Sequence, residues 1–159
     1  MRINELMCRP VATCTEETNL AAAARLMEGN DCGVLPVLRG GRIVGVITDR
    51  DVCLAVARKA AAQTPVREAM SADVASCGVN DDVRDALAVM ANRQVRRLPV
   101  VDERGGVAGV LSMDDIILRA EEPDPSRRAP GVTTREAVAA LQRIYGSRHI
   151  RSGATLAAL

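Results

Sequence analysis

Two short motifs pair a hydroxyl with a carboxylate three residues later: Thr48 with Asp51, and Ser112 with Asp115. Each motif follows an apolar, β-rich run, so we expect it to end a strand and start a helix. A helix N-terminus favours a phosphate, and the hydroxyl can donate to a phosphate oxygen. The carboxylate can accept hydrogen bonds from the two hydroxyls of a ribose. The same spacing also fits a capping box, in which both side chains satisfy the helix's own N–H groups.

The other reactive residues argue against catalysis and against a metal centre. The chain of 159 residues has a single histidine, His149, no Ser/His/Asp set and no GxxxxGK[ST] phosphate loop. Its five cysteines are odd in number and no two have CxxC spacing, so we expect free thiols in a reducing compartment and no zinc site. Paired acids such as Asp114 and Asp115 could hold Mg²⁺, but solvated acids in a first helical turn are the better interpretation. We therefore predict a protein that is not an enzyme.

Composition narrows the class of partner. The net charge is +1, from 21 basic and 20 acidic residues, and Tyr145 is the one aromatic residue. A near-neutral chain without stacking platforms is a poor nucleic-acid binder, so we predict no nucleic-acid partner. No run of 18 apolar residues occurs and the N-terminus does not open a signal peptide, so we predict no membrane association and a cytoplasmic location.

An internal repeat organises the chain. Three blocks recur in the same order, with an offset of 63 or 64 residues: 7–14 with 70–77, 35–37 with 98–100, and 45–51 with 109–115. The change of offset fits a single insertion in the turn near residues 102–106. The chain therefore contains two copies of a unit of about 60 residues.

The sequence of each unit predicts the element order βαββα. Short extended stretches at 11–14 and 74–77 precede helices at 20–28 and 81–92, for which Thr18 and Asn80 are the expected N-caps. Hairpins follow, with strands at 34–38 and 43–47 and at 98–101 and 107–111 around Gly-Gly turns. A last helix starts at Thr48 or Ser112. Thr64 and Pro65 predict a short linker helix, with Thr64 as the cap and Pro65 in the first helical position.

With both motif sets in register, the sequence resembles a tandem pair of CBS domains, the regulatory unit also called a Bateman module. The resemblance covers about residues 1–120 and rests on 35–37 with 45–51 and on 97–102 with 109–115. It implies an α+β fold in which two βαββα repeats pack about a pseudo-two-fold axis. We expect repeat 1 at 1–62, repeat 2 at 63–120, and a Pro-rich connector with a tail helix at 121–159. The resemblance also implies adenine-containing ligands (AMP, ADP, ATP, and in some members NAD or S-adenosylmethionine), no obligatory cofactor, and a homodimer.

The resemblance further implies two clefts, each joining the Thr/Ser-x-x-Asp turn of one repeat to the first hairpin strand of the other. The expected residues of the first cleft are Thr48, Arg50, Asp51, Ala75, Arg96, Arg97, Leu98 and Pro99. Those of the second cleft are Ala12, Gly33, Val34, Leu35, Pro36, Ser112, Asp114 and Asp115. Because guanidinium groups bind phosphate bidentately, we expect the first cleft to hold a phosphate-bearing ligand better. The alternatives are a solvated arginine pair at a strand edge and Leu-Pro pairs that serve only as hairpin core.

The sequence of the tail predicts a charged, Pro-rich connector followed by a helix at 135–145, with Thr133 or Thr134 as its N-cap. Val138, Leu141 and Tyr145 form its expected apolar stripe. The helix could pack on its own module or a dimer mate, dock onto an effector protein, or touch nucleic acid. The sequence therefore favours a non-catalytic adenine-nucleotide sensor that acts through dimer rearrangement or a partner protein. The alternative is an assembly module with vestigial clefts.

Overall fold

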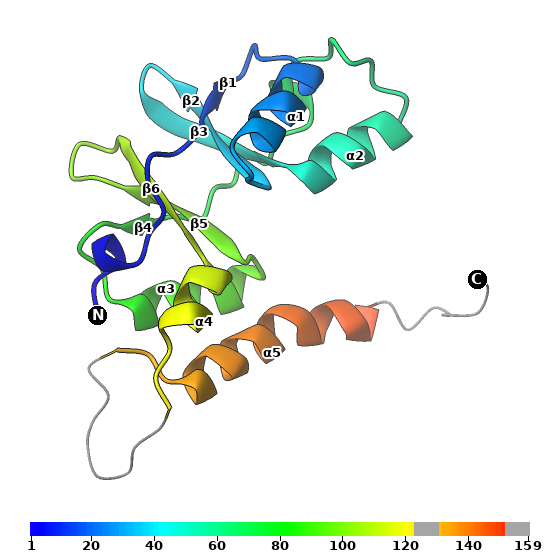
Figure 1. The fold of residues 1–159 in the computed structure, drawn as a ribbon. Coiled ribbons are helices and arrows are strands. Elements are labelled where there is room, and N and C mark those ends of the chain that lie inside the picture. Colours follow the sequence, from blue (N-terminus) through cyan, green and yellow to red (C-terminus); the bar gives the residue numbers. More distant parts are fainter. Residues whose placement is uncertain (123–130, 152–159) are drawn as a thin grey trace.

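The computed structural model describes residues 1–122 and 131–151, with side chains as far as residue 146. The connector at 123–130, with Arg127 and Arg128, lies outside the described residues, as do the side chains of Arg148, His149 and Arg151. Figure 1 shows two similar units, one above the other, with a long helix beneath the second.

The predicted βαββα repeats are confirmed. The first consists of β1 (Cys14–Thr15), α1 (Leu20–Gly29), β2 (Val34–Arg39), β3 (Arg42–Thr48) and α2 (Asp49–Ala57). The second consists of β4 (Cys77–Gly78), α3 (Val83–Arg93), β5 (Arg97–Val101), β6 (Val107–Ser112) and α4 (Met113–Arg119). In each three-stranded sheet the first strand is parallel to the central one, and the hairpin is antiparallel.

The N-caps lie later in the chain than predicted. Asn19, not Thr18, caps α1, because its side chain accepts a 2.8 Å bond from the Ala22 N–H. The Thr18 hydroxyl instead accepts from the Thr15 N–H at 3.0 Å and closes the preceding turn. Asp82, not Asn80, caps α3. Each repeat offers several capping residues in a row, and the tertiary position of the helix selects among them.

Chain segments cross between the two repeats. The 3₁₀ turn Ile3–Glu5 packs into the core of the second repeat, and the Cys8 N–H bonds to the Val110 carbonyl on β6 at 2.9 Å. The linker forms a 3₁₀ turn at Val66–Glu68, preceded by Pro65 as its N-cap, and packs into the core of the first repeat. The expected linker helix is therefore a single turn that starts one residue later than predicted. Each hydrophobic core is completed by a segment that precedes the other repeat.

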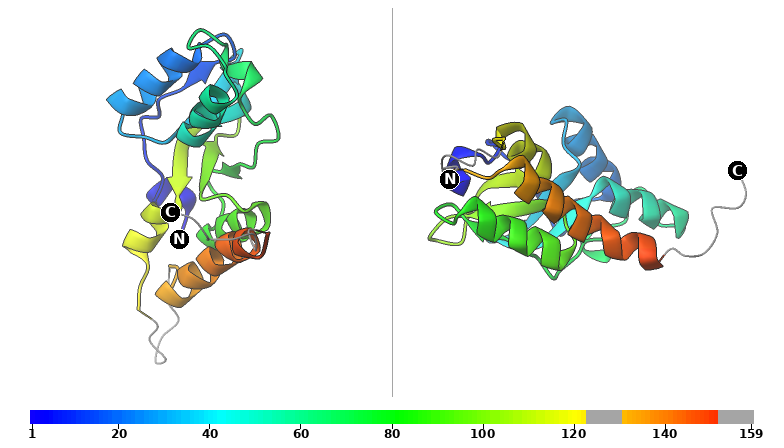
Figure 2. Two further views of the ribbon diagram at one scale, coloured as in Figure 1. Left: turned by 90° about the vertical axis from the view of Figure 1, so that its right-hand side faces the viewer. Right: turned by 90° about the horizontal axis from the view of Figure 1, so that it is seen from below.

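The tail forms α5 (Thr134–Arg151), which packs against α3 and α4 along the lower face in Figure 1, the face turned toward the viewer on the right of Figure 2. Of the three interpretations of the tail, packing on its own module is the one observed. Its buried face consists of Ala137, Ala140 and Ile144. The predicted stripe is wrong at Val138, which is 52% exposed, because the helix is rotated so that the neighbouring Ala137 faces the core. Among the described residues, no helix is long and apolar enough to cross a membrane.

Candidate functional site

The two Thr/Ser-x-x-Asp motifs form matching capping boxes at the starts of α2 and α4. Asp51 Oδ2 accepts from the Thr48 N–H at 2.9 Å and from the Thr48 hydroxyl at 2.6 Å, while the Asp51 N–H donates to Thr48 Oγ1 at 3.2 Å. Ser112 and Asp115 repeat the pattern at 2.8, 2.6 and 3.1 Å. The motif residues therefore satisfy their own helix ends, and a ligand at either box would replace these bonds.

The strand register places the motifs differently from the cleft scheme expected from the resemblance. Thr48 lies opposite Val34, and Ser112 lies opposite Arg97, each within its own hairpin. An antiparallel hairpin necessarily sets the end of its second strand beside the start of its first. The backbones of Gly33 and Val34 therefore accompany Thr48 and Asp51, and those of Arg96 and Arg97 accompany Ser112 and Asp115. The register therefore gives each motif neighbours from its own hairpin, and the grouping of these residues across the repeats stays a prediction.

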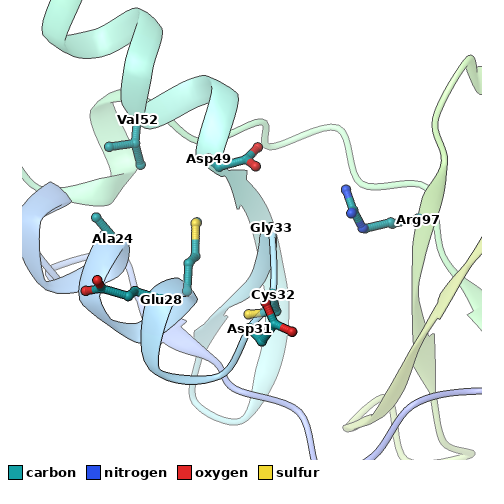
Figure 3. A pocket seen from close by; sticks show the side chains of 9 residues that line it. Ala24, Glu28, Asp31, Cys32, Gly33, Asp49, Val52 and Arg97 are labelled. Carbon is teal, nitrogen blue, oxygen red and sulfur yellow. The ribbon is translucent and has the colours of Figure 1, made fainter.

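The Arg97 side chain nevertheless reaches the first repeat. It lines a cavity of about 600 Å³ together with Ala24, Met27, Glu28, Asp31, Cys32, Gly33, Asp49 and Val52. Figure 3 shows Arg97 extending from its own strand toward Asp49 and Gly33. A Cβ at Gly33 would lie 3.0 Å from Asp49 Oδ2 and 3.6 Å from Arg97 Nη1. The absence of a side chain at residue 33 therefore keeps this junction of the two repeats open.

Charge in this cavity is mostly negative. Glu28, Asp31 and Asp49 contribute three carboxylates against the guanidinium of Arg97. A backbone N–H group at the start of α2 already has a carboxylate partner, because the Arg50 N–H donates to Asp49 Oδ1 at 2.7 Å. A phosphate would find one cation here, and it would compete with carboxylates for the helix N–H groups. Such a cavity suits a ligand of low negative charge better than a triphosphate.

Asp51 and Thr48 do not line this cavity. Asp51 lines a second, smaller cavity of about 200 Å³, on the side of α2 that faces the linker, with Thr64 and Glu68. Arg50 is exposed on the first turn of α2. Asp51 and Arg97 therefore line different cavities, and their joint contact with one ligand stays a prediction.

Most of the apolar residues expected to line the clefts are part of the cores. Leu35 and Leu98 are 0% exposed, Val34 is 7% exposed, and Pro36 and Pro99 are buried. Ala12 and Ala75 are half-buried and pack against the first and second cores, respectively. The central strands are covered on both faces, so the interpretation of the Leu-Pro pairs as hairpin core fits their burial.

The remaining candidates have partners outside the expected clefts. Arg96 Nη1 donates to the Tyr145 hydroxyl on α5 at 3.0 Å. Cys8 Sγ donates to Asp115 Oδ1 at 3.3 Å, and this hydrogen bond raises the pKa of the Cys8 thiol. Asp114 is exposed. No sequence signal indicated the Arg96–Tyr145 contact, because it joins residues 49 positions apart.

All five cysteines are free thiols. Burial raises the pKa of Cys14 to about 11 and that of Cys77 to about 12, so both are neutral. Within residues 1–122 and 131–146, no group of three or more His, Cys, Asp or Glu side chains could hold a metal ion. Glu28 and Asp31 were not singled out in the sequence, because exposed acids in the last turn of a helix and just after it resemble ordinary surface residues.

Two similar α+β units, with matched helix starts and a cavity at their junction, define a protein built as a tandem module. The chain belongs to the CBS domain family: the family model, described as "CBS domain", matches residues 3–58 and 66–122. The resemblance stated from the sequence is therefore confirmed.

Individual relatives agree with this assignment. The CBS domain-containing protein YhcV of Bacillus subtilis is 36% identical over 115 residues, covering 72% of this chain and 81% of the relative. An inosine-5'-monophosphate dehydrogenase of Thermoplasma acidophilum is 32% identical over 130 residues, covering 82% of this chain but 26% of the enzyme. This chain therefore corresponds to about a quarter of that enzyme.

Two solved structures share the fold. Hypoxic Response Protein I, with two coordinated zinc ions, has a TM-score of 0.69 and 28% identity, covering 76% of this chain and 100% of its own. A CBS domain protein from Pyrobaculum aerophilum, complexed with AMP, has a TM-score of 0.67 and 27% identity, covering 73% of this chain and 90% of its own.

Proposed function

We propose that this protein is a non-catalytic regulatory module that binds an adenine-containing ligand at the junction of its two repeats. The observation that carries the proposal is the Arg97 guanidinium, which extends from β5 of one repeat into a cavity formed by the other. A ligand that contacts Arg97 and the start of α2 would contact both repeats at once. Its binding energy would therefore depend on how the repeats are arranged, which a sensor requires.

Further support comes from the Pyrobaculum aerophilum relative, which is complexed with AMP. The charge of the cavity refines the proposal. With three carboxylates and one guanidinium, each phosphate beyond the first adds repulsion that Arg97 alone does not offset. We therefore expect AMP or a low-charge adenosyl compound to bind more tightly than ATP.

The test is calorimetry and a dye-based thermal melt of the full chain with AMP, ADP, ATP, NAD and S-adenosylmethionine. A ligand at 100 times its dissociation constant should stabilise the fold by about 2.7 kcal/mol. Arg97→Ala removes a charge-assisted contact of about 1.5–3 kcal/mol, so the AMP affinity should fall at least about tenfold. Arg104→Ala, a matched change in the exposed turn between β5 and β6, should leave the affinity unchanged.

Failure of every ligand to bind would support the assembly module with vestigial clefts, an alternative favoured by the self-satisfied capping boxes. Wild-type affinity in Arg97→Ala would overturn the proposed place of binding. The homodimer implied by the family resemblance, and signalling through it or through a partner protein in the cytoplasm, belong to the same proposal. Light scattering of the purified chain with and without AMP would test the dimer.

A further inference from the structure

Arg96 and Arg97 are consecutive residues whose side chains contact different parts of the molecule. Arg97 lines the cavity, while Arg96 contacts Tyr145 on α5. The Arg96 Nη1 donates to the Tyr145 hydroxyl at 3.0 Å, and the guanidinium carbon lies 5.9 Å from the centroid of the ring. A hydrogen bond and a cation–π contact therefore connect the tail helix to the residue beside the proposed site.

The backbone of Arg96 lies at a junction of three elements. Its carbonyl accepts from the Met113 N–H at the start of α4, at 2.9 Å. Arg97, the next residue, opens β5 and pairs with Ser112 at the end of β6. A displacement of Arg96 would therefore change contacts at the start of α4, at the cavity and at the tail.

The first repeat supplies an internal comparison. Residue 33 is the counterpart of residue 96, and there Gly33 makes the equivalent backbone contact, accepting from the Asp49 N–H at 3.4 Å. It has no side chain, and among the elements that the structure describes no helix comparable to α5 packs on α1 and α2. The repeat therefore forms without an arginine at this position, and the Arg96–Tyr145 contact is an addition specific to the tail.

The rest of α5 is held by contacts that do not involve Arg96. Arg84 Nε donates to Glu136 at 2.8 Å near the start of the helix, and Ile144 is fully buried. Arg96 is exposed and Tyr145 is half-buried, so their contact lies at the surface. Loss of this contact would free the Arg96 side chain and the Tyr145 hydroxyl while Ile144 keeps the helix packed.

We propose that Arg96 is shared between Tyr145 and an anionic ligand, which makes the Tyr145 turn of α5 the element that reports whether the site is occupied. A phosphate held by Arg97 attracts the neighbouring guanidinium and draws it away from the phenol. Coupling is reciprocal, so weakening the tyrosine contact must strengthen ligand binding. This inference rests on the function proposed above and adds the route by which binding reaches the tail.

The experiment uses the full chain with AMP as the probe. Tyr145 is the one aromatic residue in the sequence, so intrinsic tyrosine fluorescence comes from this side chain alone. We expect a saturable fluorescence change whose midpoint equals the dissociation constant from calorimetry. Tyr145→Phe keeps the ring and removes the hydroxyl, so it should bind AMP about 2- to 10-fold more tightly, the range set by one net hydrogen bond.

Arg143→Ala is the control. Arg143 Nη2 donates to Asn92 Oδ1 at 2.8 Å and ties α5 to α3 without contacting Arg96. This variant should bind AMP with wild-type affinity. AMP binding with an unchanged tyrosine signal, wild-type affinity in Tyr145→Phe, or an equal gain in Arg143→Ala would each overturn the inference and leave the proposed function standing. Absence of AMP binding in the wild type would overturn the inference, and failure of every ligand in the thermal melt would overturn the proposed function as well.

Discussion

Replacement of Asp51 by alanine distinguishes two roles of this side chain at the start of α2: capping the helix and binding a ligand. Asp51 Oδ2 accepts from the Thr48 N–H at 2.9 Å and from the Thr48 hydroxyl at 2.6 Å, so the variant opens the capping box. Loss of a cap costs about 0.5–2 kcal/mol. For a chain of this length, each kcal/mol lowers Tm by about 2–4 °C, so we expect a decrease of about 1–8 °C without ligand.

The assay is thermal and urea unfolding of Asp51→Ala, with and without saturating AMP. If Asp51 acts only as a cap, AMP should stabilise the variant as much as the wild type. If its carboxylate also binds ligand, the AMP-dependent increase in Tm should shrink. Asp114→Ala, which removes an exposed carboxylate near the second box, is the control and should leave Tm within about 1 °C of the wild type, because such surface changes cost little.

Asp115→Ala is the matched partner in the second repeat. Its box has the same three bonds, and Asp115 Oδ1 also accepts from Cys8 Sγ at 3.3 Å. We therefore expect a stability loss at least as large as that of Asp51→Ala. Wild-type unfolding midpoints for both aspartate variants would refute the assignment of the boxes as helix caps.

Three further changes test the packing, the tail and the thiols. Gly109→Ala places a Cβ 2.6 Å from Met7 Sδ, so the N-terminal segment must move away from β6, and urea unfolding should show a loss of about 1–3 kcal/mol; an unchanged midpoint would contradict this close approach. The Arg84 guanidinium lowers the pKa of Glu136 below its ordinary 4.5, so this ion pair stabilises the fold above that pH and its contribution disappears as the pH falls through the lowered pKa. Both side chains are more than a third exposed, so Glu136→Gln should lose about 0.2–1 kcal/mol at pH 7 and nothing near pH 2, as measured by urea unfolding at each pH. Cys77, buried and with its pKa raised to about 12, should react with iodoacetamide at pH 8 only after unfolding, and mass spectrometry showing its modification in the folded protein would contradict its burial.

The sequence by itself determined the repeated architecture. Blocks recurring at an offset of 63 or 64 residues, hairpins around Gly-Gly turns and the Thr/Ser-x-x-Asp helix starts are local patterns. Each depends on backbone propensity and on side chains a few residues apart, so each can be recognised without knowledge of the fold. The family followed from the same patterns, because both motif sets occur in register.

Only the tertiary structure decided which residues meet. It paired Thr48 with Val34 within one hairpin, placed the Arg97 side chain in the cavity of the other repeat, and joined Arg96 to Tyr145. It also rotated α5 so that Val138 faces outward. These outcomes depend on strand register, on side-chain direction and on the packing of segments distant in sequence. Local propensity carries no information about such contacts, because their energies arise only when the two repeats and the tail are assembled.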